Sequence, residues 1–305
     1  MVEKPATRTS PPAAVLAAFD LAGSPVPLPG GQGTTWRVDD VVLKPLEMEP
    51  ALVQWQATLL SRLDGREDFR VSAPLQTTDG QWTTRGWTAW HYQPGAHVPQ
   101  RWYDIIAVGH LLHTALSSES EPAFLPRRTD KWSIGDKVAW AELPAAGYAH
   151  FNHVPRLTAA LRPVEGCSQL IHGDLTGNVL FHETLPPLVI DLSLYWRPPA
   201  FASAIVIADA LVFEGAPEDI VEPMLEEPGF SQYLLRALIY RIVTDDLARL
   251  QHAQPVTDDP YLTAVELAIR LTRAAHRPPE IAAPAGSDRL EGCEHPEAVD
   301  TGLVS

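Results

Sequence analysis

The sequence predicts an α+β protein of two lobes, a small lobe built on an antiparallel β-sheet with a helix and a larger, mainly helical lobe. Short β-type runs broken by glycine and proline dominate the first third of the chain. Apolar residues at helical spacing dominate the remainder. A chain of 305 residues is also long for a single compact core, which favours two lobes.

The first third alternates helical and β-type patterns. Proline opens and glycine closes the first pattern, and Gly65 stops the last, whose apolar residues recur at helical spacing. The predicted elements, in order, are a helix over 11–23, a strand ending at Leu28, strands over 34–38 and 41–45, a helix over 49–65, and β-rich stretches over 69–75 and 81–92.

Gln93-Pro94-Gly95 interrupts the β-rich region, and helical periodicity follows it. We therefore predict an N-terminal lobe over 1–93, a helical lobe over 94–283 and a disordered tail over 284–305, which is rich in Pro, Gly, Ser and acids. The predicted helices of the second lobe cover 100–118, 134–143, 153–164, 200–216, 230–251 and 259–275.

Composition excludes several classes of protein. The formal net charge of −15 leaves no basic surplus for phosphates, so we expect no nucleic-acid binding. No window approaches 18 uninterrupted apolar residues and the N-terminus does not resemble a signal peptide, so we expect no membrane span. Cys167 and Cys293 suggest neither a disulfide framework nor a metal site, and a cytoplasmic location is the simplest expectation.

The stretch "LIHGDLTGNVLF", residues 170–181, holds His172, Asp174 and Asn178 in one turn between two apolar runs. Asp191 ends a further apolar run, "PLVID". Carboxylate and amide oxygens are ligands that Mg²⁺ prefers. Phosphoryl transfer needs such ligands, a carboxylate that orients the attacking hydroxyl, and backbone and a cation near the phosphates.

Candidates for the phosphate contacts lie in the first third of the chain. Gly30, Gly31 and Gly33 stand between two predicted strands, and Lys44 lies on the next strand. Each piece also has an ordinary interpretation: a hairpin turn for the glycines, an exposed edge residue for Lys44, and turn capping for the acids. The order of all the pieces along the chain favours phosphoryl transfer.

These motifs resemble the aminoglycoside phosphotransferases and related small-molecule kinases, which share the protein-kinase-like fold. The resemblance rests on the stretches "HGDLTGNVLF" and "VID", and it spans residues 11–275. Together with "PLPGGQGTTWRVDDVVLKP" and "VIDLSLYWRPP", they are similar to an actinobacterial subgroup of unassigned function. The resemblance implies an ATP- and Mg²⁺-dependent phosphotransferase acting on a hydroxyl of an unidentified small molecule.

The resemblance also implies roles for single residues. Asp174 would be the catalytic base, Asn178 and Asp191 would hold Mg²⁺, and Lys44 would contact the α- and β-phosphates beneath Gly30, Gly31 and Gly33. His172 would be structural. Residues 89–94 would form the hinge that meets adenine through its backbone, where Trp90 or Tyr92 would stack or simply belong to the core.

Two departures from the family pattern support an alternative. Asn178 follows Asp174 by four residues where five are usual, so Asn178 either reaches the metal because Gly177 relaxes the turn or only braces it. The helix over 49–65 carries no acid between Glu49 and Asp64 to pair with Lys44, although Glu47 or Glu49 at its entrance could substitute. The alternative function is therefore a nucleotide-binding pseudokinase with a regulatory or scaffolding role.

Other polar residues are open to two interpretations. Tyr195, Trp196 and Arg197 either face the substrate or pack the lobe, with Arg197 paired to an acid such as Asp209, and packing is favoured. Helical histidine pairs at 110 and 113 and at 150 and 153 lack the further ligands of a zinc site, so we expect helix-surface or core-edge roles.

Overall fold

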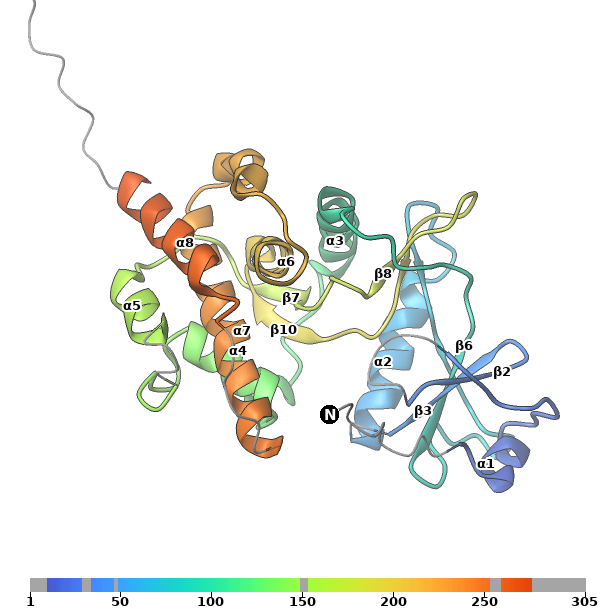
Figure 1. Cartoon of the computed structure of the whole chain (residues 1–305). Helices are drawn as coiled ribbons and strands as arrows, with labels where there is room; N and C mark the ends of the chain where they lie inside the picture. Colours follow the sequence, from blue (N-terminus) through green and yellow to red (C-terminus); the bar gives the residue numbers. More distant parts are fainter. Residues whose placement is uncertain (1–9, 29–33, 47–48, 149–152, 253–258, 276–305) are drawn as a thin grey trace, which may run out of the picture.

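A computed structural model describes residues 10–28, 34–46, 49–148, 153–252 and 259–275. A small sheet with its helix lies on one side of the molecule and the helices of the second lobe on the other (Figure 1), so the predicted α+β two-lobed fold is confirmed. Gly30, Gly31, Gly33, Glu47 and the predicted tail over 284–305 lie outside the described residues. The predicted lobe boundaries, after residues 93 and 283, stay predictions.

The small lobe is a five-stranded antiparallel sheet with the strand order β1-β2-β3-β6-β5. Its strands are β1 (Val26–Pro27), β2 (Trp36–Val38), β3 (Val41–Pro45), β5 (Pro74–Leu75) and β6 (Trp87–His91). The turn at Asp39-Asp40, between the strands predicted over 34–38 and 41–45, joins β2 to β3, and Asp39 has the left-handed φ of 51° that short polar side chains tolerate in tight turns.

The two faces of this sheet have different surroundings: one is packed on a helix, and the other carries Lys44. Leu43 of β3 is buried with Val38 and Ala89, and this face packs on helix α1 (Ala13–Ala18). Successive side chains of a strand point to opposite faces, so Lys44 lies on the other face, opposite Thr88 of β6. The alternation therefore turns Lys44 away from the small core.

Helix α1 is shorter than the predicted helix over 11–23. It ends at Ala18 because Asp20 adopts a left-handed φ of 55° and the Leu21 amide donates to the Leu16 carbonyl at 2.9 Å, closing the helix end. The expected stop at Gly23 is wrong, since a non-glycine residue supplies the left-handed conformation earlier in the chain.

Short strands tie the two lobes together. Strand β4 (Arg70–Val71) follows helix α2 (Pro50–Leu63) and pairs in parallel with β9 (Leu188–Val189), which in turn pairs antiparallel with β8 (Val179–Leu180). A bridge between Ala96 and Phe181 adds a second link. The segment that carries the polar turn over residues 172–178 is thereby fixed to the small lobe.

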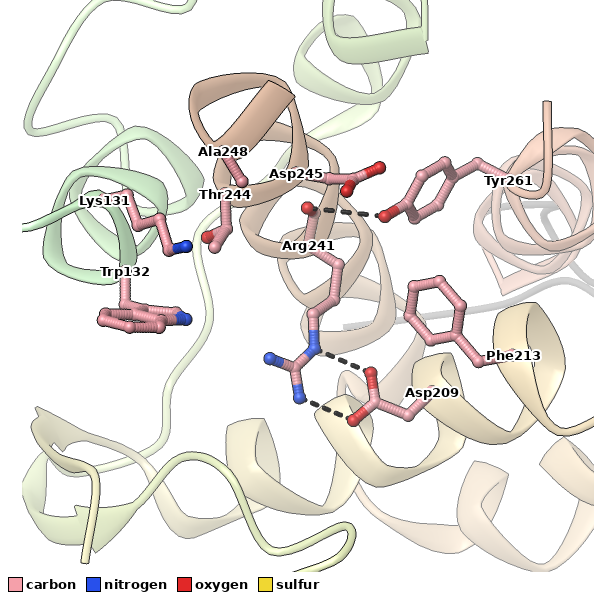
Figure 2. Close-up of a pocket in the computed structure, with 9 residues that line it drawn as sticks. All are labelled: Lys131, Trp132, Asp209, Phe213, Arg241, Thr244, Asp245, Ala248 and Tyr261. Carbon is pink, nitrogen blue, oxygen red and sulfur yellow. Dashed lines mark hydrogen bonds and ion pairs between the residues drawn. The ribbon is translucent and has the colours of Figure 1, made fainter. Parts of the chain in front are cut away.

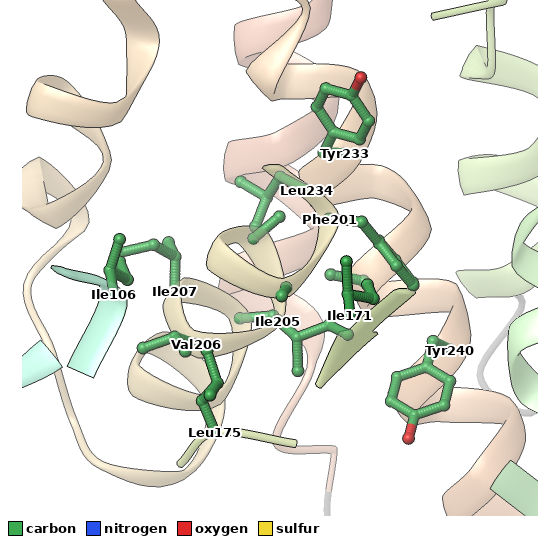
Figure 3. Close-up of a cluster of buried hydrophobic side chains, with 14 of the residues drawn as sticks. Ile106, Ile171, Leu175, Phe201, Ile205, Val206, Ile207, Tyr233, Leu234 and Tyr240 are labelled. Carbon is green, nitrogen blue, oxygen red and sulfur yellow. The ribbon is translucent and has the colours of Figure 1, made fainter. Parts of the chain in front are cut away.

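The second lobe is built around helix α6 (Pro199–Phe213), buried over residues 201–210, and the antiparallel pair of β7 (Gln169–His172) and β10 (Leu194–Arg197) (Figure 3). The other helices are α3 (Trp102–Leu116), α4 (Lys131–Ala139), α5 (His153–Ala160), α7 (Phe230–His252), α8 (Leu262–Ala275) and the 3₁₀ segments η1 (Leu125–Arg127) and η3 (Glu218–Glu226). Helix α6 is apolar on all sides because other elements surround it.

Helix α4 begins three residues before the predicted start at 134. The Asp130 side chain accepts a hydrogen bond from the Ser133 amide at 3.0 Å and caps the helix there. Gly135 lets α4 lie close to α7, since a Cβ at this position would stand 2.5 Å from Thr244 Oγ1 and 2.8 Å from the Tyr240 carbonyl. None of the helices described is long and apolar enough to cross a membrane.

Candidate active site

The polar turn between β7 and β8 closes on itself through Asn178. Its Nδ2 donates to the Asp174 carbonyl at 2.7 Å and to Asp174 Oδ2 at 3.2 Å. Gly177 has a left-handed φ of 79°, a conformation that glycine adopts readily. It allows the turn to close with Asn178 four residues after Asp174, where the family pattern in the sequence analysis has five. Asn178 therefore braces the turn with its amide nitrogen, while its Oδ1 has no partner among the described residues.

His172 is fully buried and joins this turn to the segment after β9. Its Nδ1 accepts from the amides of Asp174 at 3.3 Å and Ser193 at 3.2 Å, and its Nε2 contacts the Ile190 carbonyl at 3.3 Å. These partners require the proton on Nε2 and a neutral ring. Burial lowers the pKa of His172, so the structure agrees with its interpretation as a structural residue.

Gly173 is required by a close approach. A Cβ at this position would lie 2.5 and 2.7 Å from Cδ2 and Cε2 of the Tyr195 ring. Tyr195 is buried and its hydroxyl bonds that of Tyr240 at 3.0 Å, so the ring has no room to move aside. The glycine thus lets the backbone before Asp174 lie directly on the core.

Asp191 follows β9 in a left-handed conformation with φ of 50°, and its carboxylate forms an ion pair with Lys44. Asp191 is half exposed, so the pair faces solvent. The structure therefore brings Lys44 from the sheet to the metal-binding candidate. Among the described residues, Asp191 is the acid that takes the place of the absent helix glutamate as partner of Lys44.

Helix α2 carries a glutamine near this pair. Gln56 is buried, and its Nε2 contacts the Leu192 carbonyl at 3.4 Å. Glu49, at the start of α2, is exposed and makes no ion pair with Lys44 among the described residues. The helix therefore supports the segment after Asp191 through a neutral side chain and does not hold Lys44 by charge.

Asn178 and Asp191 fit a magnesium ion by their chemistry. Both side chains offer oxygen atoms, and the backbone carbonyl of Asn178 accepts from the Ile190 amide at 3.0 Å, which sets Asn178 beside Asp191. Within the described part of the chain, no group of three His, Cys, Asp or Glu side chains forms a metal site. Mg²⁺ commonly keeps waters and phosphate oxygens as ligands, so two or three protein oxygens suffice.

The predicted hinge is largely engaged in internal contacts. Trp90 packs against the main core, and its indole nitrogen donates to Thr88 Oγ1 at 3.1 Å. Tyr92 lies under the Arg37 guanidinium, 3.6 Å from ring centre to Cζ, and its amide donates to the Asp40 carbonyl. The Gln93 side-chain oxygen accepts from Arg70 Nη1 at 3.2 Å, whereas its backbone N–H has no hydrogen-bond partner in the described part of the chain.

Arg241 of α7 is a site residue that the sequence analysis missed. Its Nη2 donates to Asp174 Oδ1 at 2.8 Å and to Asp209 Oδ2 at 2.5 Å, and its Nε donates to Asp209 Oδ1 at 2.7 Å. Asp209, on α6, is buried. Burial raises the pKa of the Asp209 carboxyl, and the charge of Arg241 opposes this shift. The arginine thus links the candidate base to a buried carboxylate.

A cavity of about 290 Å³ opens beside Arg241 (Figure 2). It lies between α4, α6, α7 and the start of α8. Its lining combines aromatic and charged side chains, namely Trp132, Phe213, Tyr261, Lys131, Asp209, Arg241 and Asp245, with Thr244 and Ala248. Since Arg241 also holds Asp174, the cavity adjoins the candidate catalytic carboxylate.

The residues after β9 pack the lobe, as the favoured interpretation predicted. Tyr195 is buried and Trp196 packs against the core. Arg197 pairs with Asp136 in two hydrogen bonds of 3.0 and 2.7 Å and with Glu142 at 2.7 Å. The partner suggested from sequence, Asp209, is wrong, because Arg241 occupies that carboxylate.

The two histidine pairs do not form metal sites within the described residues, although His150 lies outside them. His110 Nε2 lies 3.1 Å from Ser203 Oγ, and His153 Nε2 lies 2.8 Å from Asp259. His113 is buried, and its Nε2 accepts the His172 amide at 3.1 Å. His110, His113 and His153 therefore each have a structural contact.

His113 predicts acid sensitivity of the fold. Burial lowers the pKa of His113 to about 3, whereas the unfolded chain titrates near 6.5. The unfolded state therefore binds the extra proton first, and stability falls as the pH drops below 6.5. Between pH 7 and 5 we expect His113 alone to cost about 2 kcal/mol. Urea unfolding at both pH values measures this, and His113→Gln should show a smaller pH dependence; an equal dependence contradicts the assignment.

Comparison with known proteins finds likeness in structure alone. No protein-family model and no curated protein sequence matches the chain. The structure superposes on an amicoumacin kinase solved in complex with AMP-PNP, Ca²⁺ and Ami, with 13% identity, a TM-score of 0.56, and coverage of 85% of this chain and 91% of that one. It also superposes on a spectinomycin phosphotransferase solved with ADP and spectinomycin, with 14% identity, a TM-score of 0.53, and coverage of 86% and 96%.

A third match is the choline kinase LicA from Streptococcus pneumoniae, with 12% identity, a TM-score of 0.50, and coverage of 85% of this chain and 96% of that one. All three matches cover both lobes of the fold. The chain therefore has the protein-kinase-like fold shared by aminoglycoside phosphotransferases and choline kinases.

Proposed function

We propose that this chain is an ATP- and Mg²⁺-dependent phosphotransferase that moves the γ-phosphoryl group to a hydroxyl of a small molecule. The observation that carries the proposal is the convergence of Lys44, Asp191 and the turn that holds Asp174 and Asn178, with a cavity beside Arg241, the partner of Asp174. The spectinomycin phosphotransferase was solved with ADP and its small acceptor, which supports the same pair of ligands here.

Each residue has a defined task in this proposal. Asp174 accepts a hydrogen bond from the acceptor hydroxyl and takes its proton as the phosphoryl group transfers. Asn178 Oδ1 and the Asp191 carboxylate hold Mg²⁺. When bound, Mg²⁺ neutralises charge on the phosphate oxygens. Lys44 would exchange its contact with Asp191 for the α- and β-phosphates, and its place on the face of β3 turned away from the small core supports that exchange.

Two observations favour the alternative of a nucleotide-binding pseudokinase. The Asn178 amide is engaged in bracing the turn, and Lys44 has Asp191 as its partner in place of a helix glutamate. Such a protein would bind nucleotide without a functional metal site. The two functions therefore differ in how far nucleotide binding depends on Mg²⁺ and Asp191.

Thermal unfolding with and without ATP and Mg²⁺ tests the proposal. A ligand that binds only the native state stabilises it by about 2.7 kcal/mol at 100 times its dissociation constant. We expect an ATP-induced rise in Tm that needs Mg²⁺ and is lost in Asp191→Asn. Asparagine is the apt substitution because it tolerates the left-handed φ at this position. Asp64→Asn, an exposed carboxylate at the end of α2, is the matched control.

The outcomes separate the candidate functions. A shift that persists without Mg²⁺ and in Asp191→Asn supports the pseudokinase. If millimolar ATP does not change Tm, both functions are contradicted, because both require that the chain binds a nucleotide.

A further inference from the structure

The cavity beside Asp174 has a charge pattern that bears on the acceptor, and the inference drawn from it rests on the proposed function. The Asp209 carboxylate lines the cavity but is held by two nitrogens of Arg241. Asp245 also lines it and pairs with Arg249 at 2.8 Å. Each carboxylate of the cavity therefore already has a guanidinium partner.

The cations of the cavity are less fully matched. Lys131 forms no ion pair with any residue the structure describes, and its ammonium lies 4.7 Å from the ring centre of Trp132. Figure 2 shows the Lys131 side chain extending across the cavity toward α7. Lys131 is thus a donor group with unused hydrogen bonds beside an aromatic face.

Arg241 offers a second free donor. Its Nε and one terminal nitrogen bind Asp209 and Asp174, while Nη1 has no partner in the described part of the chain. In Figure 2 this nitrogen points away from Asp209, toward the side of the cavity that Lys131 and Trp132 occupy. Guanidinium and ammonium donors that face one space suit a carboxylate or a phosphate ester.

We propose that the cavity binds an acceptor with a carboxylate or phosphate-ester group, held by Lys131 and Arg241 Nη1, and with a ring that lies against Trp132. The hydroxyl to be phosphorylated would face Asp174, on the far side of the Arg241 guanidinium. An acceptor whose only charges are ammonium groups would find both cavity carboxylates already paired. The acceptor class is therefore hydroxylated and anionic.

Three sugars of similar size test the charge preference: glucuronate, glucose and glucosamine, with charges of −1, 0 and +1. Their dissociation constants are measured by calorimetry on the full chain. We expect glucuronate to bind about tenfold more tightly than either of the others, since charge-assisted hydrogen bonds are the stronger ones. Lys131→Met should lower glucuronate binding to the level of glucose without changing glucose binding. Arg156→Gln, which removes a positive charge on α5, should keep the preference.

Equal binding of the three sugars, tightest binding of glucosamine, absence of binding, or a preference that survives Lys131→Met overturns the inference. The readout does not depend on phosphoryl transfer. A wild-type chain that binds glucuronate selectively but never releases ADP keeps the anion site and loses the proposed function. A chain that releases ADP with neutral or cationic acceptors and shows no preference for the anion keeps the proposed function and loses the anion site.

Discussion

Replacing Asp174 by Asn is expected to lower the rate of phosphoryl transfer by about 100-fold or more and to leave nucleotide binding unchanged. The amide has the size of the carboxylate but cannot accept the hydroxyl proton. The turn should persist, because Asn178 donates mainly to the backbone carbonyl of residue 174 at 2.7 Å. Lys44 and Asp191, which serve the nucleotide in our proposal, pair with each other and do not bond Asp174.

ADP release in the presence of an acceptor that the wild-type chain phosphorylates measures the rate, and the ATP-induced shift in Tm measures binding. Asp219→Asn, an exposed carboxylate on η3, provides the control for a loss of one negative charge. If Asp174→Asn turns over within threefold of the wild-type rate, the assignment of Asp174 as the base is wrong. A fall in both turnover and ATP binding would instead indicate that the loop had moved.

The parts of the site that sequence could predict are the local ones. His172, Asp174 and Asn178 lie within seven residues between two apolar runs, so their proximity follows from the chain itself. Lys44 was predicted on the strand over 41–45, and strand side chains alternate, so the burial of Leu43 turns Lys44 to the other face. The structure adds that Gly173 is fixed by the Tyr195 ring, which only tertiary packing could reveal.

Partners across long stretches of sequence were beyond local reasoning. Asp209 stands in an apolar helix, which signals a buried pair, but Arg197 and Arg241 were equally available to it by charge alone. The packing of the helices decides which arginine binds which acid. Arg197 lies beside Asp136 of α4, and Arg241 of α7 lies beside Asp209 of α6. The one available signal for Arg241 was an arginine inside the apolar run "LLRALIYRIV".

Removing the Arg241 side chain charge is expected to destabilise the fold by about 3–5 kcal/mol, because it leaves a buried carboxylate without its partner. Arg241→Met keeps the length of the side chain while removing all its donors. Burial already raises the pKa of Asp209 with the arginine present, so loss of the arginine raises it further. Urea unfolding at pH 7 measures the change in the free energy of unfolding.

Two further variants isolate the pair. Arg249→Met lies two turns along the same helix in a more exposed pair with Asp245, and it should cost less than about 1 kcal/mol. Arg241→Met with Asp209→Asn removes both charges and should recover about 2 kcal/mol relative to Arg241→Met. A double variant no more stable than the single one would show that the guanidinium contributes through packing and not through Asp209.

The double variant also separates stability from catalysis. It restores much of the fold yet still leaves Asp174 without the 2.8 Å hydrogen bond from Arg241 Nη2. If Arg241 positions the base, the double variant should stay slow in phosphoryl transfer even at saturating acceptor, with Lys44 and Asp191 still giving the Mg²⁺-dependent shift with ATP. If its rate returns with its stability, Arg241 acts on the fold alone, and Asn178 suffices to hold Asp174 in place.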